Sequence, residues 1–121
     1  MIENNEADLS LLMDYFVDSD CYTKYEILSD LQAKQKEPDF LCLLTDDGFL
    51  LGYKSERNAL WIAQLMNHGR WKDMRDMVAY AKEWAKKRGM LGIAGETGRD
   101  QLRAMERLGW VYISTVVGQR I

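Results

Sequence analysis

Histidine and cysteine, which often serve as catalytic bases and nucleophiles, are few in this sequence and widely spaced. His68 is the only histidine, so it is the only side chain of the type that titrates near neutral pH. Cys21 and Cys42 lie far from each other and from His68, so we expect neither a metal site nor a disulfide framework. A serine or cysteine nucleophile would depend on His68 alone, and no local motif supports one.

Charge divides this chain of 121 residues into two parts, although its net charge is only −3. Residues 1–47 hold twelve acidic residues against three lysines, whereas residues 48–121 hold thirteen basic residues against seven acidic ones. The second part could present a basic surface to an anionic ligand, or the two parts could simply attract each other. Net acidity argues against nucleic acid as the main partner. The sequence shows no membrane span and no leader, so we expect a cytoplasmic protein.

The first half predicts two helices followed by an antiparallel meander. The first helix follows an N-cap at Asn5 or Asp8, and the second ends before Pro38, which disfavours helix in the residue before it. The apolar residues that define the two helical faces are Leu9, Leu12, Met13, Phe16 and Val17, then Tyr22, Tyr25, Leu28 and Leu31. Short apolar runs over 40–45, 49–53 and 60–66, separated by turn residues, predict three antiparallel strands.

The second half predicts a long helix and further strands. An apolar stripe from Trp71 to Ala85 predicts a helix over 71–88, with Gly89 just past its end. A buried strand over 90–95, a short helix over 99–108 and a closing strand over 110–117 follow. The order is αα-βββ-α-β-α-β. It predicts one α+β domain over residues 1–121, with helices flanking a mixed, mostly antiparallel sheet in α/β/α-like layers.

This order resembles the GCN5-related N-acetyltransferase (GNAT) superfamily. The helix ending Trp84-Ala85-Lys86-Lys87-Arg88-Gly89 is similar to the end of the family's long helix. The passage Ala104-Met105-Glu106-Arg107-Leu108-Gly109-Trp110 is similar to its helix-to-strand turn. Met1-Ile2-Glu3 resembles a shortened first strand, and the chain ends at Ile121 with little room for the family's last strand. The resemblance implies a GNAT-like acyl-CoA N-acyltransferase fold, with acyl-CoA between its fourth and fifth strands.

The coenzyme-binding loop departs from the family's pattern. Family members place small residues in a loop before the long helix, so that its backbone can approach phosphates. Residues 67–75 can be aligned with that loop in two ways. Neither alignment has glycine at the positions that require a small residue, and one of them places Asp73 at such a position. Binding of acetyl-CoA would then depend on backbone groups of the fourth strand and on nearby bases. These candidates are Leu65, Met66, Asn67, Gly69, Arg70, Lys72, Arg99 and Arg103.

The family's acid and base are also absent. Met105 stands where a tyrosine often serves as the general acid, and Gln64 stands near a common glutamate base. The resemblance leaves Glu96 and His68 as candidate bases and Tyr112 as a candidate acid. Each also has an ordinary structural explanation: a solvated strand end for Glu96, a surface or capping residue for His68 and a strand aromatic for Tyr112.

Three interpretations of function remain open. The sequence favours a non-catalytic structural or interaction module with a degenerate acyl-CoA site, whose partner is a protein or a second copy. Short GNAT-like proteins of this kind occur among bacteriophage virion components, and this sequence looks similar in size and layout. The alternative is an acyl-CoA-dependent N-acetyltransferase that acts on a primary amine. The third is an α+β domain unrelated to GNAT proteins, which parallel, splayed fourth and fifth strands would exclude.

Overall fold

The computed structural model describes residues 1–17, 21–96, 106–107, 109–113 and 116–120, with the backbone alone for strands β6 and β7. The elements are β1 (Ile2–Glu3), the 3-10 helix η1 (Leu9–Tyr15), α1 (Lys24–Gln35), β2 (Phe40–Thr45), β3 (Gly48–Lys54), β4 (Leu60–Asn67), α2 (Trp71–Lys87), β5 (Gly92–Glu96), β6 (Val111–Ile113) and β7 (Val116–Arg120). Within this part of the chain, no helix is long and apolar enough to cross a bilayer.

One seven-stranded sheet runs in the order β1-β2-β3-β4-β5-β7-β6. Strands β2, β3 and β4 form the predicted antiparallel meander, and β1 extends it by pairing Ile2 with Leu44. Strand β5 then lies parallel to β4, because α2 crosses over between them. The parallel arrangement confirms the predicted mixed sheet.

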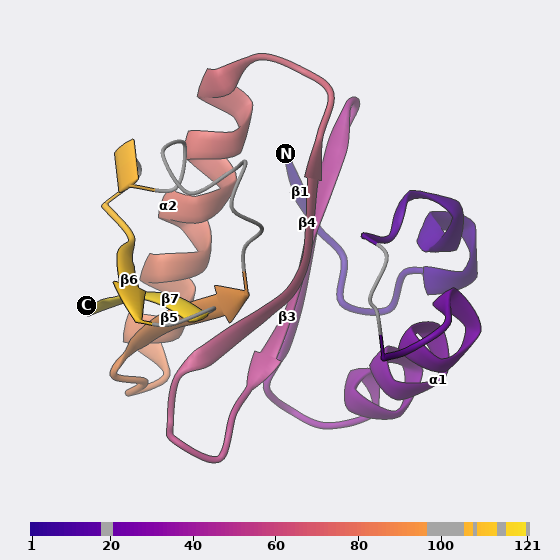
Figure 1. The fold of residues 1–121 in the computed structure, drawn as a ribbon, viewed down its shortest axis with the longest axis horizontal. Coiled ribbons are helices and arrows are strands. Elements are labelled where there is room, and N and C mark those ends of the chain that lie inside the picture. The colour runs from indigo at the N-terminus through magenta and orange to yellow at the C-terminus, as the bar shows by residue number, and fades with distance from the viewer. Residues whose placement is uncertain (18–20, 97–105, 108, 114–115, 121) are drawn as a thin grey trace.

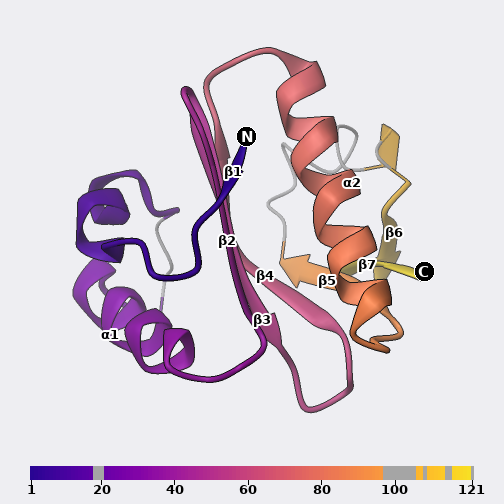
Figure 2. The ribbon, with the colours of Figure 1, turned by 180° about the vertical axis from the view of Figure 1, so that it is seen from behind.

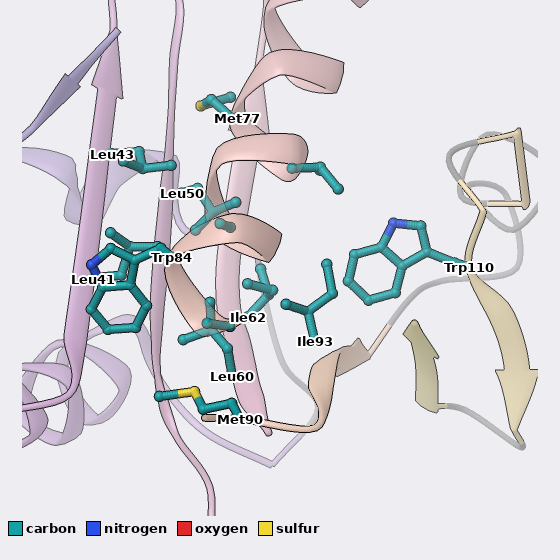
Figure 3. Close-up of a cluster of buried hydrophobic side chains, with 13 residues drawn as sticks. Leu41, Leu43, Leu50, Leu60, Ile62, Met77, Trp84, Met90, Ile93 and Trp110 are labelled. Atoms are coloured by element: carbon teal, nitrogen blue, oxygen red, sulfur yellow. The ribbon is translucent and has the colours of Figure 1, made fainter. Parts of the chain in front are cut away.

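The sheet has a helix layer on each face (Figures 1 and 2). On one face, α2 buries its apolar stripe, including Met77, Ala81 and Trp84, against alternate strand residues such as Leu41 and Leu50 (Figure 3). On the other face, η1 and α1 cover a second cluster. Its buried members are Leu9, Phe16, Leu31, Phe40, Cys42, Phe49 and Leu51. The two clusters use opposite faces of β2 and β3, which explains why these strands are apolar almost throughout.

The first helical segments differ from the prediction in detail. Asp8 is the N-cap as predicted, but residues 9–15 form a 3-10 helix, and Val17 lies beyond it and is exposed. Thr23 is the N-cap of α1, so Tyr22 precedes that helix. Tyr25 lies on its outer face and is 73% exposed. The predicted inward face was therefore wrong for both tyrosines: the Thr23 cap leaves Tyr22 outside the helix, and Tyr25 lies on the solvent side of its first turn.

The carboxyl-terminal strands correct a second expectation. The closing segment is a pair of antiparallel strands, and β7 lies between β5 and β6. All five residues of β5 pair with β7, from Gly92 with Arg120 to Glu96 with Val116. The expectation that little room remains for a last strand was wrong, since five residues suffice to pair with β5. Of the predicted helix over 99–108, the structure describes only Glu106 and Arg107, which are helical; the rest lies outside the described residues.

Candidate functional site

Strands β4 and β5 pair only at their beginnings. Leu60, Trp61 and Ile62 pair with residues 93–95, after which β4 continues to Asn67 while β5 ends at Glu96. Figure 1 shows β4 continuing past the end of β5 toward the start of α2. On the β5 side, residues 63–67 have no strand partner among the described residues. Their backbone edge on that side is therefore open, and it includes Leu65, Met66 and Asn67, the predicted coenzyme contacts.

A β-bulge lies where the two strands separate. Leu51 of β3 pairs with Gln64, whereas Gly52 pairs with Ile62, so Ala63 is an extra residue in β4. The bulge changes which residues face each helix layer. Ile62 and Leu65 contact the α2 cluster, whereas Ala63 and Gln64 both lie on the α1 side. The bulge thus brings Gln64 to a surface that simple alternation along β4 would not predict.

The start of α2 is open. Its N-cap residue, Arg70, makes no capping hydrogen bond with its side chain. The Asn67 side chain holds the preceding loop instead: Oδ1 accepts from the Gly69 N–H (3.1 Å), and Nδ2 donates to the carbonyl oxygen of Arg70 (3.1 Å). No capping side chain satisfies the N–H groups of Trp71 and Lys72 at the head of the helix. A helix start of this kind attracts an anion.

Carboxylates surround this helix start. A Cβ on Gly69 would lie 2.9 Å from Asp47 Cβ and 3.1 Å from Asp73 Oδ2, so only glycine fits between them. The two predicted phosphate-binding bases pair with aspartates on α2. Arg70 lies 3.8 Å from Asp73, and Lys72 lies 2.8 Å from Asp76. The hydrogen bond from Lys72 lowers the pKa of Asp76. Because the Arg70 side chain is 80% exposed, its ion pair is weak, and the side chain can turn toward a ligand.

The structure places His68 and Glu96 in separate hollows. His68 is exposed, and its backbone N–H donates to the carbonyl oxygen of Asp47 (2.8 Å). Its hollow is bordered by Leu12 and Tyr15 at the η1 side of the sheet. Glu96 instead borders a hollow beside α1. Tyr112 lies on β6, where its backbone pairs with Val117. Arg99 and Arg103 lie outside the described residues.

The hollow beside α1, here called the acceptor hollow, was not anticipated from the sequence. It has a volume of about 770 Å³. Its described lining is Tyr22, Glu26, Ile27, Ser29, Asp30, Leu31, Ala33, Tyr53, Trp61, Ala63, Gln64 and Glu96. No signal in the sequence pointed to it, because the apolar spacing placed Tyr22 on the inward face of a predicted helix, whereas Tyr22 is exposed in the structure.

The acceptor hollow is acidic and contains a buried amide. Burial raises the pKa of Tyr53, and the nearby charges of Asp30 and Glu37 raise it further. Gln64 is only 8% exposed; its Oε1 accepts from the backbone N–H of Val17 (2.8 Å). No described residue accepts a hydrogen bond from its Nε2. That amide group therefore has a donor to offer a ligand in the hollow.

The described residues offer no other reactive centre. No group of three or more His, Cys, Asp or Glu side chains among them could hold a metal ion. The Cys42 thiol is buried and free, and burial raises its pKa to about 11. The Cys42 thiol is therefore protonated at neutral pH and is not a nucleophile.

Solved structures show which fold this arrangement represents. No protein-family model and no curated protein sequence matches the chain. A PaiA N-acetyltransferase from Thermoplasma acidophilum, in complex with coenzyme A, superimposes with a TM-score of 0.70 at 15% identity, covering 99% of this chain and 98% of that one. The chain has the GNAT acetyltransferase fold.

Two further structures are similar to the same GNAT fold. An IAA acetyltransferase from Bacillus cereus gives a TM-score of 0.66 at 16% identity, covering 93% of this chain and 78% of that one. A probable acetyltransferase of the GNAT family from Chromobacterium violaceum gives 0.58 at 11% identity, covering 90% and 74%. At these identities the likeness shows the fold alone. Together with the parallel, separating β4 and β5, it excludes an α+β fold other than the GNAT fold.

Proposed function

We propose that this chain is an acyl-CoA-dependent N-acetyltransferase that acts on a primary amine. The observation that carries the proposal is the separation of β4 from β5 beyond Ile62, next to the open start of α2. Together they offer an unpaired strand edge and helix N–H groups along one path. A neighbour with the same fold was solved with coenzyme A, which supports an acyl-CoA ligand.

The start of α2 can hold the phosphates of acetyl-CoA in part through its backbone and in part through side chains. The N–H groups of Trp71 and Lys72 supply the helix-terminal anion site. Arg70 and Lys72 add charge that the carboxylates of Asp47 and Asp73 partly oppose. Binding is therefore expected to be weaker than in a glycine-rich loop and sensitive to salt. Arg99 and Arg103 remain predicted contributors.

The chemistry follows from the two surfaces that meet at β4. Acetyl-CoA supplies an activated thioester, and a backbone N–H group of β4 near residues 65–67 polarises its carbonyl oxygen. The acceptor amine enters as an ammonium ion and first loses a proton, for which Glu96 is the carboxylate at the acceptor hollow. Its nitrogen attacks the carbonyl carbon and forms the C–N bond. The C–S bond breaks, and the coenzyme A sulfur takes the second proton released from the nitrogen.

A different observation favours the second candidate, a non-catalytic interaction module. The side chains of Asp47 and Asp73 lie close to Gly69, and the glycines of the family's phosphate-binding loop are absent. Exposed apolar side chains on η1, on α1 and in the segment between them could contact a protein partner or a second copy: Leu11, Tyr15, Val17, Tyr22 and Tyr25. A bacteriophage virion origin and a cytoplasmic location remain predictions from the sequence.

An acetyl-transfer assay separates the two candidates. The protein is incubated with acetyl-CoA and butylamine, while thiol release and N-acetylbutylamine are followed together. An enzyme releases thiol in proportion to amide, and Arg70→Ala raises the KM for acetyl-CoA about tenfold, since a charge-assisted contact is lost. Lys87→Ala, at the opposite end of α2, is the matched control and leaves KM unchanged. Thiol release without amide, or no turnover above the uncatalysed rate, contradicts the proposal.

A further inference from the structure

We infer that the acceptor hollow binds a linear organic dication, a diamine or polyamine, as the acyl acceptor. The inference rests on the proposed function and adds the class of acceptor. Three features of the hollow carry it: an excess of carboxylates, aromatic rings beside them and a buried amide at the β4 bulge.

The charge of the lining selects cations. Glu26, Asp30 and Glu96 border the hollow, and no lysine or arginine is among its described lining. The two lysines at the ends of α1 are not part of this lining, although Lys34 lies over the Tyr53 ring. Lys24 Nζ lies 3.4 Å from the carbonyl oxygen of Asp14, and Lys34 Nζ lies 4.0 Å from Glu37. An anionic acceptor would therefore be repelled and a cationic one attracted.

The aromatic rings reinforce this selection. Tyr22, Tyr53 and Trp61 border the hollow, and ring faces attract ammonium groups. The Tyr53 ring already makes a cation–π contact within the protein, because Lys34 Nζ lies 5.1 Å from the centre of the ring. The methylene chain of a diamine would pack on the same rings, and its ammonium ends would meet carboxylates.

The carboxylates lie on two different walls, which is why we infer two charges in the ligand. Glu26 and Asp30 are one helical turn apart on α1, whereas Glu96 ends β5 on the sheet side. Gln64 is also on the sheet side, with its Nε2 unpartnered among the described residues. Its natural complement is an oxygen such as that of the acyl group. The sheet wall is therefore the end for acyl transfer, and the α1 wall holds the second ammonium.

The volume suits such a ligand. At about 770 Å³ the hollow lies within the range of roughly 300–1,000 Å³ that is usual for small-molecule sites. In the reaction only the amine at the sheet wall changes. It loses one proton to Glu96 or water and the second to the coenzyme A sulfur as the C–N bond forms and the C–S bond breaks. The other ammonium keeps its charge between Glu26 and Asp30.

The test compares putrescine, butylamine and γ-aminobutyrate, which share a four-carbon chain and differ at the far end. Binding to the full chain is measured by titration calorimetry without acetyl-CoA, and acetylation is measured with it. Putrescine is expected to bind about tenfold more tightly than butylamine and to have a kcat/KM about tenfold higher. γ-Aminobutyrate is expected to have the lowest affinity and the lowest kcat/KM. Equal values for putrescine and butylamine overturn the inference.

A charge-removing pair of variants assigns the effect to the hollow. Asp30→Asn is expected to weaken putrescine binding and raise its KM about two- to fivefold, the size for an exposed charge, with a smaller change for butylamine, which lacks the second ammonium group. Glu56→Gln removes an equal charge in the β3–β4 turn and is the control. An unchanged Asp30→Asn variant overturns the inference. Dication binding without any acetyl-CoA turnover would overturn the proposed function and leave the dication site standing.

Discussion

The two long helices begin in opposite ways. At the start of α1, Thr23 accepts from the N–H of Glu26, and the Glu26 carboxylate accepts from the N–H of Thr23, a complete capping box. At the start of α2, Arg70 caps nothing, and the Asn67 side chain holds only the preceding loop. The sequence closes one helix start with its own side chains and leaves the other open to an external anion.

The surroundings of the two starts differ as well. Beside α1 lies the acceptor hollow, whose carboxylates favour a cation. Beside α2 lies a smaller hollow of about 500 Å³, whose lining combines two basic residues, Arg70 and Lys72, with four aspartates: Asp46, Asp47, Asp73 and Asp76. An acetyltransferase needs both kinds of site, one for anionic acetyl-CoA and one for an amine. Under the proposed function, carboxylates without a basic partner, aromatic rings and a buried amide mark the acceptor side, whereas an uncapped helix start with two basic residues marks the coenzyme side.

Reversing the charge at the open start should have the largest effect. Arg70→Asp removes a phosphate contact and adds a carboxylate that competes for the same N–H groups. We expect acetyl-CoA affinity to fall by about 2–3 kcal/mol, close to a hundredfold, in titration calorimetry. Thermal unfolding checks that the variant is folded. An affinity within threefold of the wild type would show that the start of α2 is not the phosphate site.

Removing the cap at the closed start should cost stability instead. Thr23→Ala deletes one half of the capping box and is expected to lower the free energy of unfolding by about 1 kcal/mol in urea denaturation. Thr23→Ser keeps the hydroxyl and is the matched control. Acetyl-CoA affinity should not change in either variant. A loss of affinity in Thr23→Ala would mean that the two helix starts are not independent.

Neutralising the carboxylate beside Gly69 should improve coenzyme binding. Asp73→Asn removes a negative charge from the first turn of α2 without altering its size. We expect acetyl-CoA to bind about threefold more tightly at low salt, with the gain shrinking as salt rises. Asp39→Asn, remote from this site, should leave the affinity unchanged. Weaker binding in Asp73→Asn would contradict the placement of phosphate there.

A substitution that caps α2 should have the smallest effect on stability, and it should weaken the binding of acetyl-CoA. Serine in place of Arg70 can accept from the helix N–H groups, since the residue already has the extended backbone of an N-cap. We expect Arg70→Ser to raise the free energy of unfolding by about 0.5 kcal/mol relative to Arg70→Ala while both weaken acetyl-CoA binding. Equal stability of the two variants would show that the N–H groups are satisfied in another way.

Local signals predicted most of the fold. The second helix ends before Pro38, the turn at residues 46–47 joins the hairpin, and Gly89 follows α2 with a φ of 73°. These boundaries depend on residue chemistry within a few positions. The parallel β4 and β5 followed from the resemblance to GNAT proteins combined with a long crossover helix.

The candidate site was less predictable, because its geometry depends on pairing between distant residues. The bulge at Ala63 exists only in register with Leu51 and Gly52 of β3, and it decides that Gln64 faces α1. The same non-local geometry puts His68 and Glu96 in different hollows. The resemblance could mark Gln64 as replacing a base, but sequence alone could not show an unpartnered amide beside an acidic, aromatic hollow.

Calorimetric titration of the full chain with acetyl-CoA tests the central claim most directly. The account predicts micromolar binding that weakens with salt and is lost in Arg70→Asp, because the open start of α2 holds the phosphates. No detectable heat and no thermal stabilisation at millimolar acetyl-CoA would contradict it, and the GNAT fold would then serve as an interaction module.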